Sequence, residues 1–194
     1  TNIKVRKKTQ PPPSSAIFTS NPLRELDWLL DRWRLEIYPS NKNLKLNIYS
    51  GSLTYGKFGK KHFKNSEIIL KKAKRLKSFG INVFSLKRNE LFNKIKESRV
   101  FLYKGTKDET FCMSAAEAQV LGVPCVVCNY GSMQERVRNN QTGFVCQDDK
   151  EFVKKTIKLL NDDDIWMKMH SNLIKNNNHL KWSKVAKIWQ KILK

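Results

Sequence analysis

The sequence predicts a doubly wound α/β domain, built on a mainly parallel sheet with helices on both faces. Short apolar segments alternate with longer segments of helical periodicity, and this alternation is typical of βα units that form a parallel sheet. The length of 194 residues fits one domain with a sizeable core. Six segments are expected to form the strands: residues 16–19, 44–49, 81–86, 99–103, 124–128 and 143–146.

The first 15 residues are basic and contain Pro11-Pro12-Pro13, so we interpret them as a linker ahead of a domain at residues 16–194. The chain begins at Thr1 rather than Met, which suggests a fragment or a processed chain. No signal peptide is expected, because the basic opening leads into prolines and not into an apolar core.

The first helix is predicted over residues 23–38, where Leu26, Leu29, Leu30 and Trp33 share one apolar face. The glycine- and lysine-rich stretch at 51–64 is expected to be a flexible basic loop. Asn65 or Ser66 would cap the next helix, and Gly80 would close it. A further helix is predicted over residues 89–97.

In the second half, Ser132 with Glu135 and Asp148 with Glu151 have capping-box spacing. The first pair predicts a short helix, and the second predicts a helix that runs through Leu160. Helices are also expected around 165–174 and 182–193, the last with Trp182, Val185, Ile188, Trp189 and Ile192 on its apolar face.

The formal charge of +21, from 38 Lys and Arg against 17 Asp and Glu, favours anionic partners such as nucleotide phosphates or an anionic membrane surface. Nucleic acid is not favoured, because no aromatic-interleaved binding motif accompanies the charge. Lysines at 57 and 60 could add charge to a cleft or belong to a solvated insertion that touches lipid. No apolar run reaches the ~20 residues that span a bilayer.

The metal and redox signals are weak. Cys125-x-x-Cys128 lies in a predicted strand, where positions three apart face opposite sides, so the four cysteines are interpreted as small buried side chains in a reducing, cytoplasmic setting. The three histidines, at 62, 170 and 179, have no ligand spacing and are interpreted as ordinary surface or helix residues. Asp162-Asp163-Asp164 is interpreted as a helix start, so no metal and no cofactor are expected.

Two glutamates, Glu109 and Glu117, are separated by seven residues. The first follows an apolar strand in a turn, and the second lies in the opening turn of a helix. Unpaired backbone N–H groups at a helix start bind anions, and carboxylates beside them suit the hydroxyls of a sugar or a ribose. An alternative is local: Ser114-x-x-Glu117 is a capping box, and Glu109 could be an ordinary loop acid.

The context favours the functional interpretation. A Glu-Ala helix is followed by a Gly122-Val-Pro124 turn, an apolar strand and the Gly131-Ser-x-x-Glu135 turn, in that order. This series resembles the donor-binding half of retaining GT-B glycosyltransferases, especially family 4, and the resemblance covers residue 16 to the C-terminus. It implies that the last helix packs across an interdomain hinge.

The resemblance implies roles for individual residues. Glu109, the candidate catalytic residue, would contact hydroxyls of the donor sugar by positioning and electrostatics, and Glu117 would accept from the ribose. The backbone amides of Phe111, Cys112 and Met113 would lie near the sugar and phosphate. Arg24 would bind the diphosphate, Ser20 replaces a usual arginine, and Glu25 stands where glycine is common.

The turn Ser85-Leu86-Lys87-Arg88 would face the donor base, with Lys87 as the candidate side chain. The implied function is transfer of a sugar from a nucleotide diphosphate sugar to an unidentified glycan, lipid or protein acceptor. The acceptor domain is missing from this sequence. The alternative is a catalytically inactive, basic Rossmann-like scaffold on a membrane or nucleic acid, which the departures at Ser20 and Glu25 support.

Overall fold

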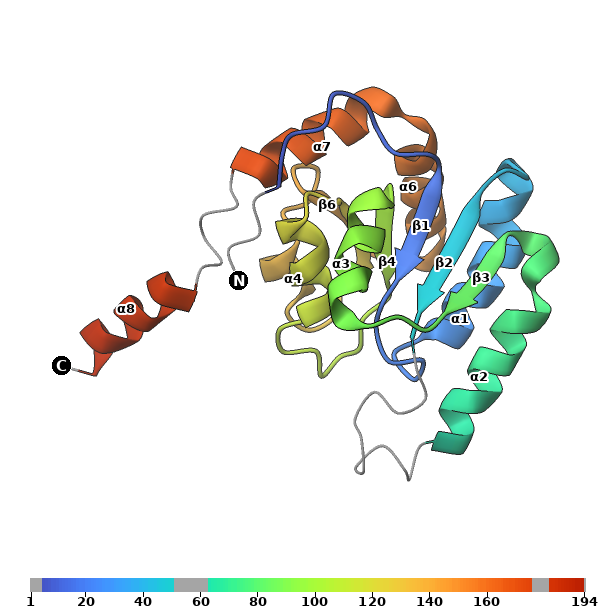
Figure 1. Cartoon of the computed structure of the whole chain (residues 1–194), viewed down its shortest axis with the longest axis horizontal. Coiled ribbons are helices and arrows are strands. Elements are labelled where there is room, and N and C mark those ends of the chain that lie inside the picture. Colours follow the sequence, from blue (N-terminus) through green and yellow to red (C-terminus); the bar gives the residue numbers. More distant parts are fainter. Residues whose placement is uncertain (1–4, 51–62, 176–181, 194) are drawn as a thin grey trace.

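The fold is a six-stranded parallel sheet with helices on both faces, seen in a computed structural model that describes residues 5–50, 63–175 and 182–193 (Figure 1). The strand order is β3-β2-β1-β4-β5-β6, and every neighbouring pair is parallel. The predicted fold class is confirmed. The strands are β1 Ser15–Phe18, β2 Lys45–Tyr49, β3 Ile81–Phe84, β4 Val100–Tyr103, β5 Cys125–Cys128 and β6 Gly143–Cys146.

The helices form two layers around this sheet. Helices α1, α2 and α6 pack on one face, where α6 also contacts the π-helical turn after α1. Helices α3 and α4 contact each other on the opposite face (Figure 1). The helices are α1 Leu26–Arg32, α2 Phe63–Arg75, α3 Arg88–Glu97, α4 Met113–Val120, α5 Met133–Arg136, α6 Asp149–Asn161, α7 Asp163–Lys175 and α8 Trp182–Ile192.

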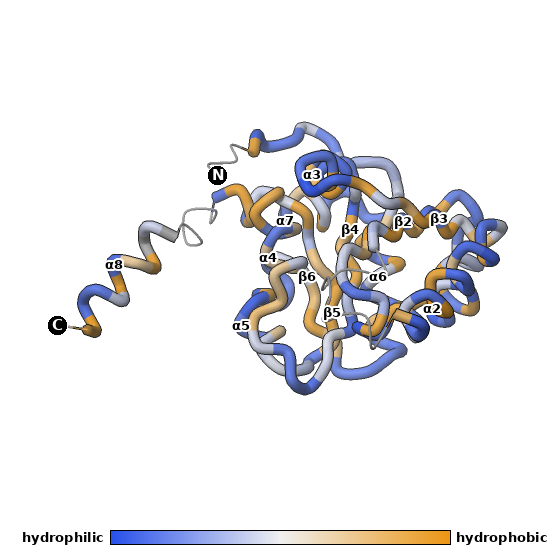
Figure 2. The backbone as a smooth tube through the Cα atoms, turned by 60° about the horizontal axis from the view of Figure 1, so that its bottom comes forward, coloured by the Kyte–Doolittle hydropathy of each residue, from blue (hydrophilic) through white to orange (hydrophobic). Residues whose placement is uncertain are grey.

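The strands differ in how many of their faces are buried. All residues of β4, β5 and β6 are buried, as expected for parallel strands covered on both sides. Strand β2 instead alternates, with Leu46 and Ile48 buried and the residues between them more accessible. Figure 2 shows apolar segments in the interior and hydrophilic stretches on the outer helices. One face of the sheet is therefore only partly covered at β2.

The first predicted helix is broken into pieces in the structure. Glu25 takes a left-handed backbone conformation (φ 61°), so the regular helix begins at Leu26 and not at residue 23. It continues as a π-helical turn over Trp33–Ile37 and a 3₁₀ turn over Tyr38–Ser40. The apolar stripe was predicted correctly, since Leu26, Leu29, Leu30 and Trp33 are all buried. Periodicity alone does not reveal a change of helix type.

The start of α2 was predicted wrongly. The helix begins at Phe63, so Asn65 and Ser66 lie inside it, and the Ser66 side chain is buried. Its end is followed by a 3₁₀ turn over Lys77–Phe79 that Gly80 closes, as predicted, with φ 69°. A Cβ atom on Gly80 would lie 2.2 Å from the carbonyl oxygen of Leu44. The predicted basic loop, with Lys57 and Lys60, falls almost entirely outside the described residues.

Of the two predicted capping boxes, only the side-chain cap at Asp148 forms, and the Glu151 carboxylate bonds the residue before the N-cap instead of the N-cap itself. Asp148 Oδ1 accepts from the backbone N–H of Glu151 at 2.7 Å, and the Glu151 carboxylate accepts from the N–H of Gln147 at 2.9 Å. At α5, by contrast, Ser132 makes no side-chain cap, so that prediction was wrong.

His170 helps to attach the N-terminal segment to the domain. The ring accepts from the backbone N–H of Lys8 at Nε2 (2.9 Å), and Nδ1 lies 2.6 Å from the carbonyl oxygen of Gly122. Burial lowers the pKa of His170. The prediction of an ordinary helix histidine is refined here to a buried structural one, while His62 and His179 lie outside the described residues.

All four cysteines are buried and unpaired, as predicted. Across the described ranges, no cluster of three or more His, Cys, Asp or Glu side chains could hold a metal ion. The predicted helix start at the Asp162-Asp163-Asp164 run is correct, since α7 begins at Asp163. Among the described helices, none has the length and apolar character needed to cross a membrane.

The last helix does not contribute to the core. Ile188 and Trp189 of α8 are 51% and 57% exposed, and the helix stands apart from the sheet in Figure 1. The apolar face predicted for this helix therefore does not pack against the core of the domain described here. The expected packing across an interdomain hinge stays a prediction.

Candidate functional site

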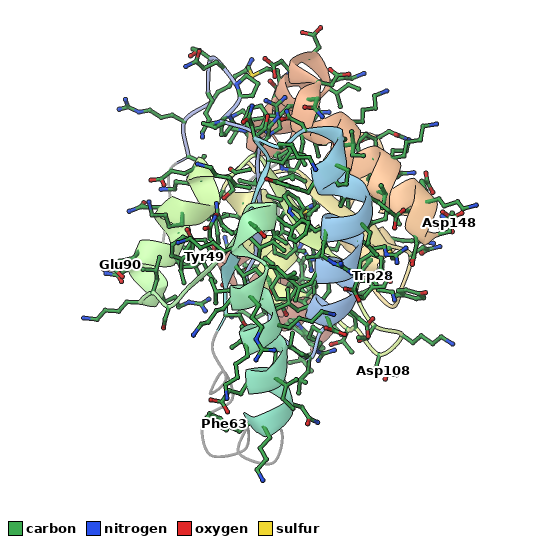
Figure 3. All side chains as sticks on the ribbon, turned by 90° about the vertical axis from the view of Figure 1, so that its right-hand side faces the viewer. Trp28, Tyr49, Phe63, Glu90, Asp108 and Asp148 are labelled. Atoms are coloured by element: carbon green, nitrogen blue, oxygen red, sulfur yellow. The ribbon has the colours of Figure 1, made fainter. Side chains whose placement is uncertain are left out.

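The candidate site lies at the carboxyl edge of the sheet, where ligands bind in open parallel α/β folds. The loops after β1, β3 and β4 and the first turns of α4, which follows the β4 loop, carry the predicted residues to this edge. Figure 3 shows Asp108, the neighbour of Glu109, at this edge, below Trp28 of α1. The chain topology therefore gathers segments that are up to about 100 residues apart in the sequence.

Glu109 is held in place by several hydrogen-bond donors. Its Oε2 accepts from the Tyr103 hydroxyl at 2.5 Å, and its Oε1 accepts from the backbone N–H of Cys112 at 3.0 Å. Burial and the Glu109 carboxylate raise the pKa of Tyr103 well above its usual range, so this hydroxyl stays a donor. The Glu109 side chain is only 12% exposed. Its position and orientation are thus fixed before any ligand arrives.

The start of α4 lies next to this carboxylate. Cys112 is the N-cap residue, with left-handed backbone geometry (φ 54°), and no side-chain hydrogen bond caps the helix. The amides of the first turn, beginning at Met113, are therefore available to an anion. Burial raises the pKa of the Cys112 thiol to about 11, so it is a neutral thiol and not a nucleophile near neutral pH.

Arg24 reaches the same place from the loop after β1. Its guanidinium donates to the Thr106 hydroxyl at 2.9 Å and lies 3.8 Å from Glu109. Ser20 lies in the same loop, and its carbonyl accepts from the Ser50 hydroxyl at 2.6 Å. The structure thus brings Arg24 and Glu109 together.

Glu25 does not act as an unpaired carboxylate beside the candidate phosphate site. Its carboxylate accepts from Lys104 at 3.1 Å, and the same ammonium lies 4.7 Å from the centre of the Trp28 ring. The negative charge that could repel a diphosphate is therefore compensated within the protein. This departure from the usual glycine does not by itself exclude phosphate binding.

Glu117 is not a helix cap. It forms an ion pair with Arg88 at the start of α3, and α4 is capped at residue 112, so the Ser114-Glu117 capping box does not exist. Its side chain is 16% exposed. Desolvation raises the pKa of Glu117, and Arg88 partly offsets that effect.

The other predicted residues are more exposed. Phe111 and Met113 have 42% and 52% of their surface accessible. Lys87 is also exposed, and its backbone N–H donates to the Glu90 carboxylate at 3.2 Å. Its side chain makes no contact that connects it to Glu109 or Glu117 in the described part of the chain.

Arg136 was not predicted from the sequence. Its Nε donates to the carbonyl oxygen of Phe111 at 3.1 Å, and its guanidinium lies 3.9 Å from the Phe111 ring centre. Two buried hydroxyl oxygens near this edge, in Thr19 and Ser132, have no hydrogen-bond partner among the described residues. The Gly-Ser-x-x-Glu turn next to Arg136 was the signal that could have indicated it.

Comparison with known proteins identifies the family. A sequence model of the family described as Glycosyl transferases group 1 matches residues 58–180, more than half of the chain. The chain belongs to this family. No curated protein sequence matches this group 1 chain.

Solved structures share the fold of this group 1 chain at low sequence identity. TarM of S. aureus is 16% identical with a TM-score of 0.74, over 98% of this chain and 37% of TarM. The pneumococcal O-GlcNAc transferase GtfA, in complex with UDP and GlcNAc, is 16% identical with a TM-score of 0.69, over 97% and 37%. Anabaena HepE, in complex with UDP, is 14% identical with a TM-score of 0.73, over 93% and 48%. The chain therefore spans less than half the length of each of these proteins, which have the GT-B fold.

Proposed function

We propose that this chain is the donor-binding domain of a retaining, family 4 type GT-B glycosyltransferase. It would move a sugar from a nucleotide diphosphate sugar to an acceptor of unidentified class. The observation that carries the proposal is the fixed Glu109 carboxylate, which lies beside both Arg24 and the open start of α4. Membership of the group 1 family supports it.

The diphosphate would bind between Arg24 and the first-turn amides of α4. A guanidinium presents a planar fork to phosphate oxygens, and the helix N-terminus adds its dipole. As the bond between sugar and diphosphate breaks, negative charge grows on the leaving group. Donors that are already in place stabilise that charge without reorganisation.

Glu109 would orient the hydroxyls of the donor sugar. Each of its two oxygens already accepts a hydrogen bond, from Tyr103 and from the Cys112 amide. Both donors stabilise the carboxylate and reduce its nucleophilicity. The role proposed for Glu109 is therefore positioning and electrostatic stabilisation, and not attack on the sugar.

Glu117 would accept hydrogen bonds from the ribose hydroxyls, beside Arg88. UDP is the first nucleotide to test, because the structures of GtfA and HepE were determined with UDP. No metal is required by this scheme, since Arg24 and the α4 amides supply the positive potential. The acceptor site is proposed to lie on a further domain, and cytoplasmic location, with peripheral membrane contact through the +21 charge, stays a proposal.

The test is calorimetric titration of the full 194-residue chain with UDP, GDP and ADP and with their glucose and N-acetylglucosamine conjugates. The proposal predicts saturable binding of one nucleotide series. Arg34→Lys is the matched control for Arg24→Lys, because the two arginine side chains are 37% and 36% exposed. Failure of every nucleotide to bind would favour the inactive scaffold alternative.

A further inference from the structure

A groove of about 850 Å³ lies on the sheet face opposite α1 and α2, apart from the Glu109 site. Its floor is the accessible face of β2 and β3, and its walls are residues 7–13 and the second half of α3. The groove exists because the crossover from β3 to β4 carries α3 past β2 toward the middle of the sheet, as Figure 1 shows.

The floor of the groove is aromatic at one end and rich in amides in the middle. The rings of Tyr49 and Phe84 stack with centres 5.0 Å apart, and Phe84 remains 41% exposed. Beside them, Asn82 donates to Asn47 across the two strands at 3.3 Å. These four side chains stand where a sheet covered on both faces would carry apolar residues. They combine a flat apolar surface with free amide hydrogen-bonding capacity.

The charged side chains that line the groove are mostly cationic. Four lysines and one glutamate line it, and that glutamate, Glu97, pairs with Lys94 at 2.7 Å. Lys7 and Lys45 have no acidic side chain within 4.0 Å among the residues the structure describes. Lys8 donates to the carbonyl of Lys96, and burial lowers its pKa while the Glu97 carboxylate partly offsets that effect. An anionic ligand would be stabilised here.

We propose that this groove binds an acidic saccharide, meaning a sugar chain that carries carboxylate or phosphate groups. The C–H face of a sugar ring would pack on Phe84 and Tyr49, since aromatic rings offer a large apolar surface with a negative face. Its hydroxyls would exchange hydrogen bonds with Asn47 and Asn82, and its acidic groups would lie near Lys45 and Lys7. The proposal rests on the proposed function only in that the chain acts on sugars.

The groove is placed to hold a sugar chain near the donor. Phe84 is the last residue of β3, and only residues 85–87 separate it from Arg88, which pairs with Glu117. The aromatic end of the groove thus adjoins the carboxyl edge. A chain held there would lie beside the nucleotide-sugar site without occupying it.

The test uses calorimetry on the full chain with trigalacturonate as the acidic probe and maltotriose as the neutral one. Phe84→Ala is expected to raise the Kd for trigalacturonate roughly fivefold or more, and Lys45→Gln is expected to weaken binding most at low salt. Leu35→Ala and Lys71→Gln are controls, because both are exposed, at 52% and 65%, and lie outside the groove. They should bind the probe as the unmodified chain does.

Several results would overturn the proposal. These are failure of trigalacturonate to bind, binding no tighter than that of maltotriose, and equal binding to the groove variants and the controls. Tighter, Phe84-dependent binding of a thymidine decanucleotide would make this a nucleic-acid site instead. UDP is titrated in parallel, and its affinity should not change in the groove variants. If the unmodified chain does not bind UDP, the proposed function is contradicted, while the conclusion about saccharide binding in the groove is unaffected.

Discussion

The guanidinium of Arg88 is ion-paired with the carboxylate of Glu117, although the two lie 29 positions apart in the sequence. The pair joins the first residue of α3 to the middle of α4. Glu117 is the more buried partner, at 16% exposure against 69% for Arg88. Burial therefore disfavours the charged form of the Glu117 carboxylate, and the exposed arginine partly offsets that effect.

Glu117→Gln is expected to weaken UDP binding by roughly 1.5–3 kcal/mol, because hydrogen bonds from the ribose to a charged acceptor are lost. Folding should be affected little, since Glu117 caps no helix and its desolvated charge disappears. Calorimetry and urea denaturation measure the two effects separately. A loss of stability with unchanged UDP affinity would show that the residue is structural.

Arg88→Gln should make UDP binding more sensitive to acid. Without the guanidinium, desolvation raises the pKa of Glu117 further above its ordinary value of 4.5. The affinity, which needs the carboxylate, should then fall at a higher pH than in the unmodified chain.

The same substitution has a defined effect on stability. A carboxyl with a raised pKa binds its proton more tightly in the folded state, so the free energy of unfolding falls as pH rises from 4.5 through the raised pKa. In Arg88→Gln this window should extend further toward neutral pH. The change at pH 7 should be small, about 1 kcal/mol or less, because Arg88 is mostly exposed. Superimposable pH profiles of the two proteins would contradict this account.

Tyr103→Phe removes one of the two hydrogen bonds to Glu109. We expect the free energy of unfolding to fall by about 1.5–3 kcal/mol, the usual range for a hydrogen bond to a charged group. Binding of a nucleotide sugar should weaken more than binding of the free nucleotide, because Glu109 is proposed to contact the sugar. Equal effects on UDP and UDP-sugar would argue against that placement.

Arg24→Lys should weaken UDP binding almost as much as Arg24→Ala, because an ammonium cannot reproduce a bidentate guanidinium contact. The loss expected for either variant is roughly 1.5–3 kcal/mol. Arg34→Lys, with matched exposure, should change UDP affinity by less than the error of the titration. If Arg24→Lys binds UDP normally, the phosphate site has been placed wrongly.

Gly131→Ala tests the support of the Glu109 loop. Gly131 has φ 52°, and a Cβ atom there would lie 2.3 Å from the carbonyl oxygen of Glu109. The loop must shift, so we expect destabilisation of at least about 1 kcal/mol together with weaker nucleotide-sugar binding. Thermal unfolding and calorimetry test this, and an unchanged protein would mean that the loop adapts freely.

The parts of the fold that are determined by residues close together in the sequence could be predicted. All six strands follow from short apolar runs, and the cap at Asp148 follows from a spacing of three residues. The cap expected at Ser66 failed because that serine is buried inside α2, where tertiary packing outweighs its local preference. The π-helical turn at Trp33–Ile37 leaves no distinct periodicity in so short a segment.

The site was predictable only as a set of candidates. Motif order placed Arg24, Glu109 and Glu117 at one sheet edge, and the structure brings the first two within 3.8 Å. The sequence left a helix cap open as the alternative role of Glu117, and the structure excludes that cap, because Glu117 pairs with Arg88 on another helix. Arg136 was missed because its contact with Phe111 spans 25 residues.

The most direct test of the central claim is to map UDP onto the full chain by backbone amide NMR. We predict the largest chemical-shift changes at Glu109, Cys112, Met113 and Ser114, around the open start of α4, with loss of these changes in Arg24→Ala. Shifts confined to the groove around Tyr49 and Phe84, or no shifts at all, would contradict the claim that the carboxyl edge binds the donor.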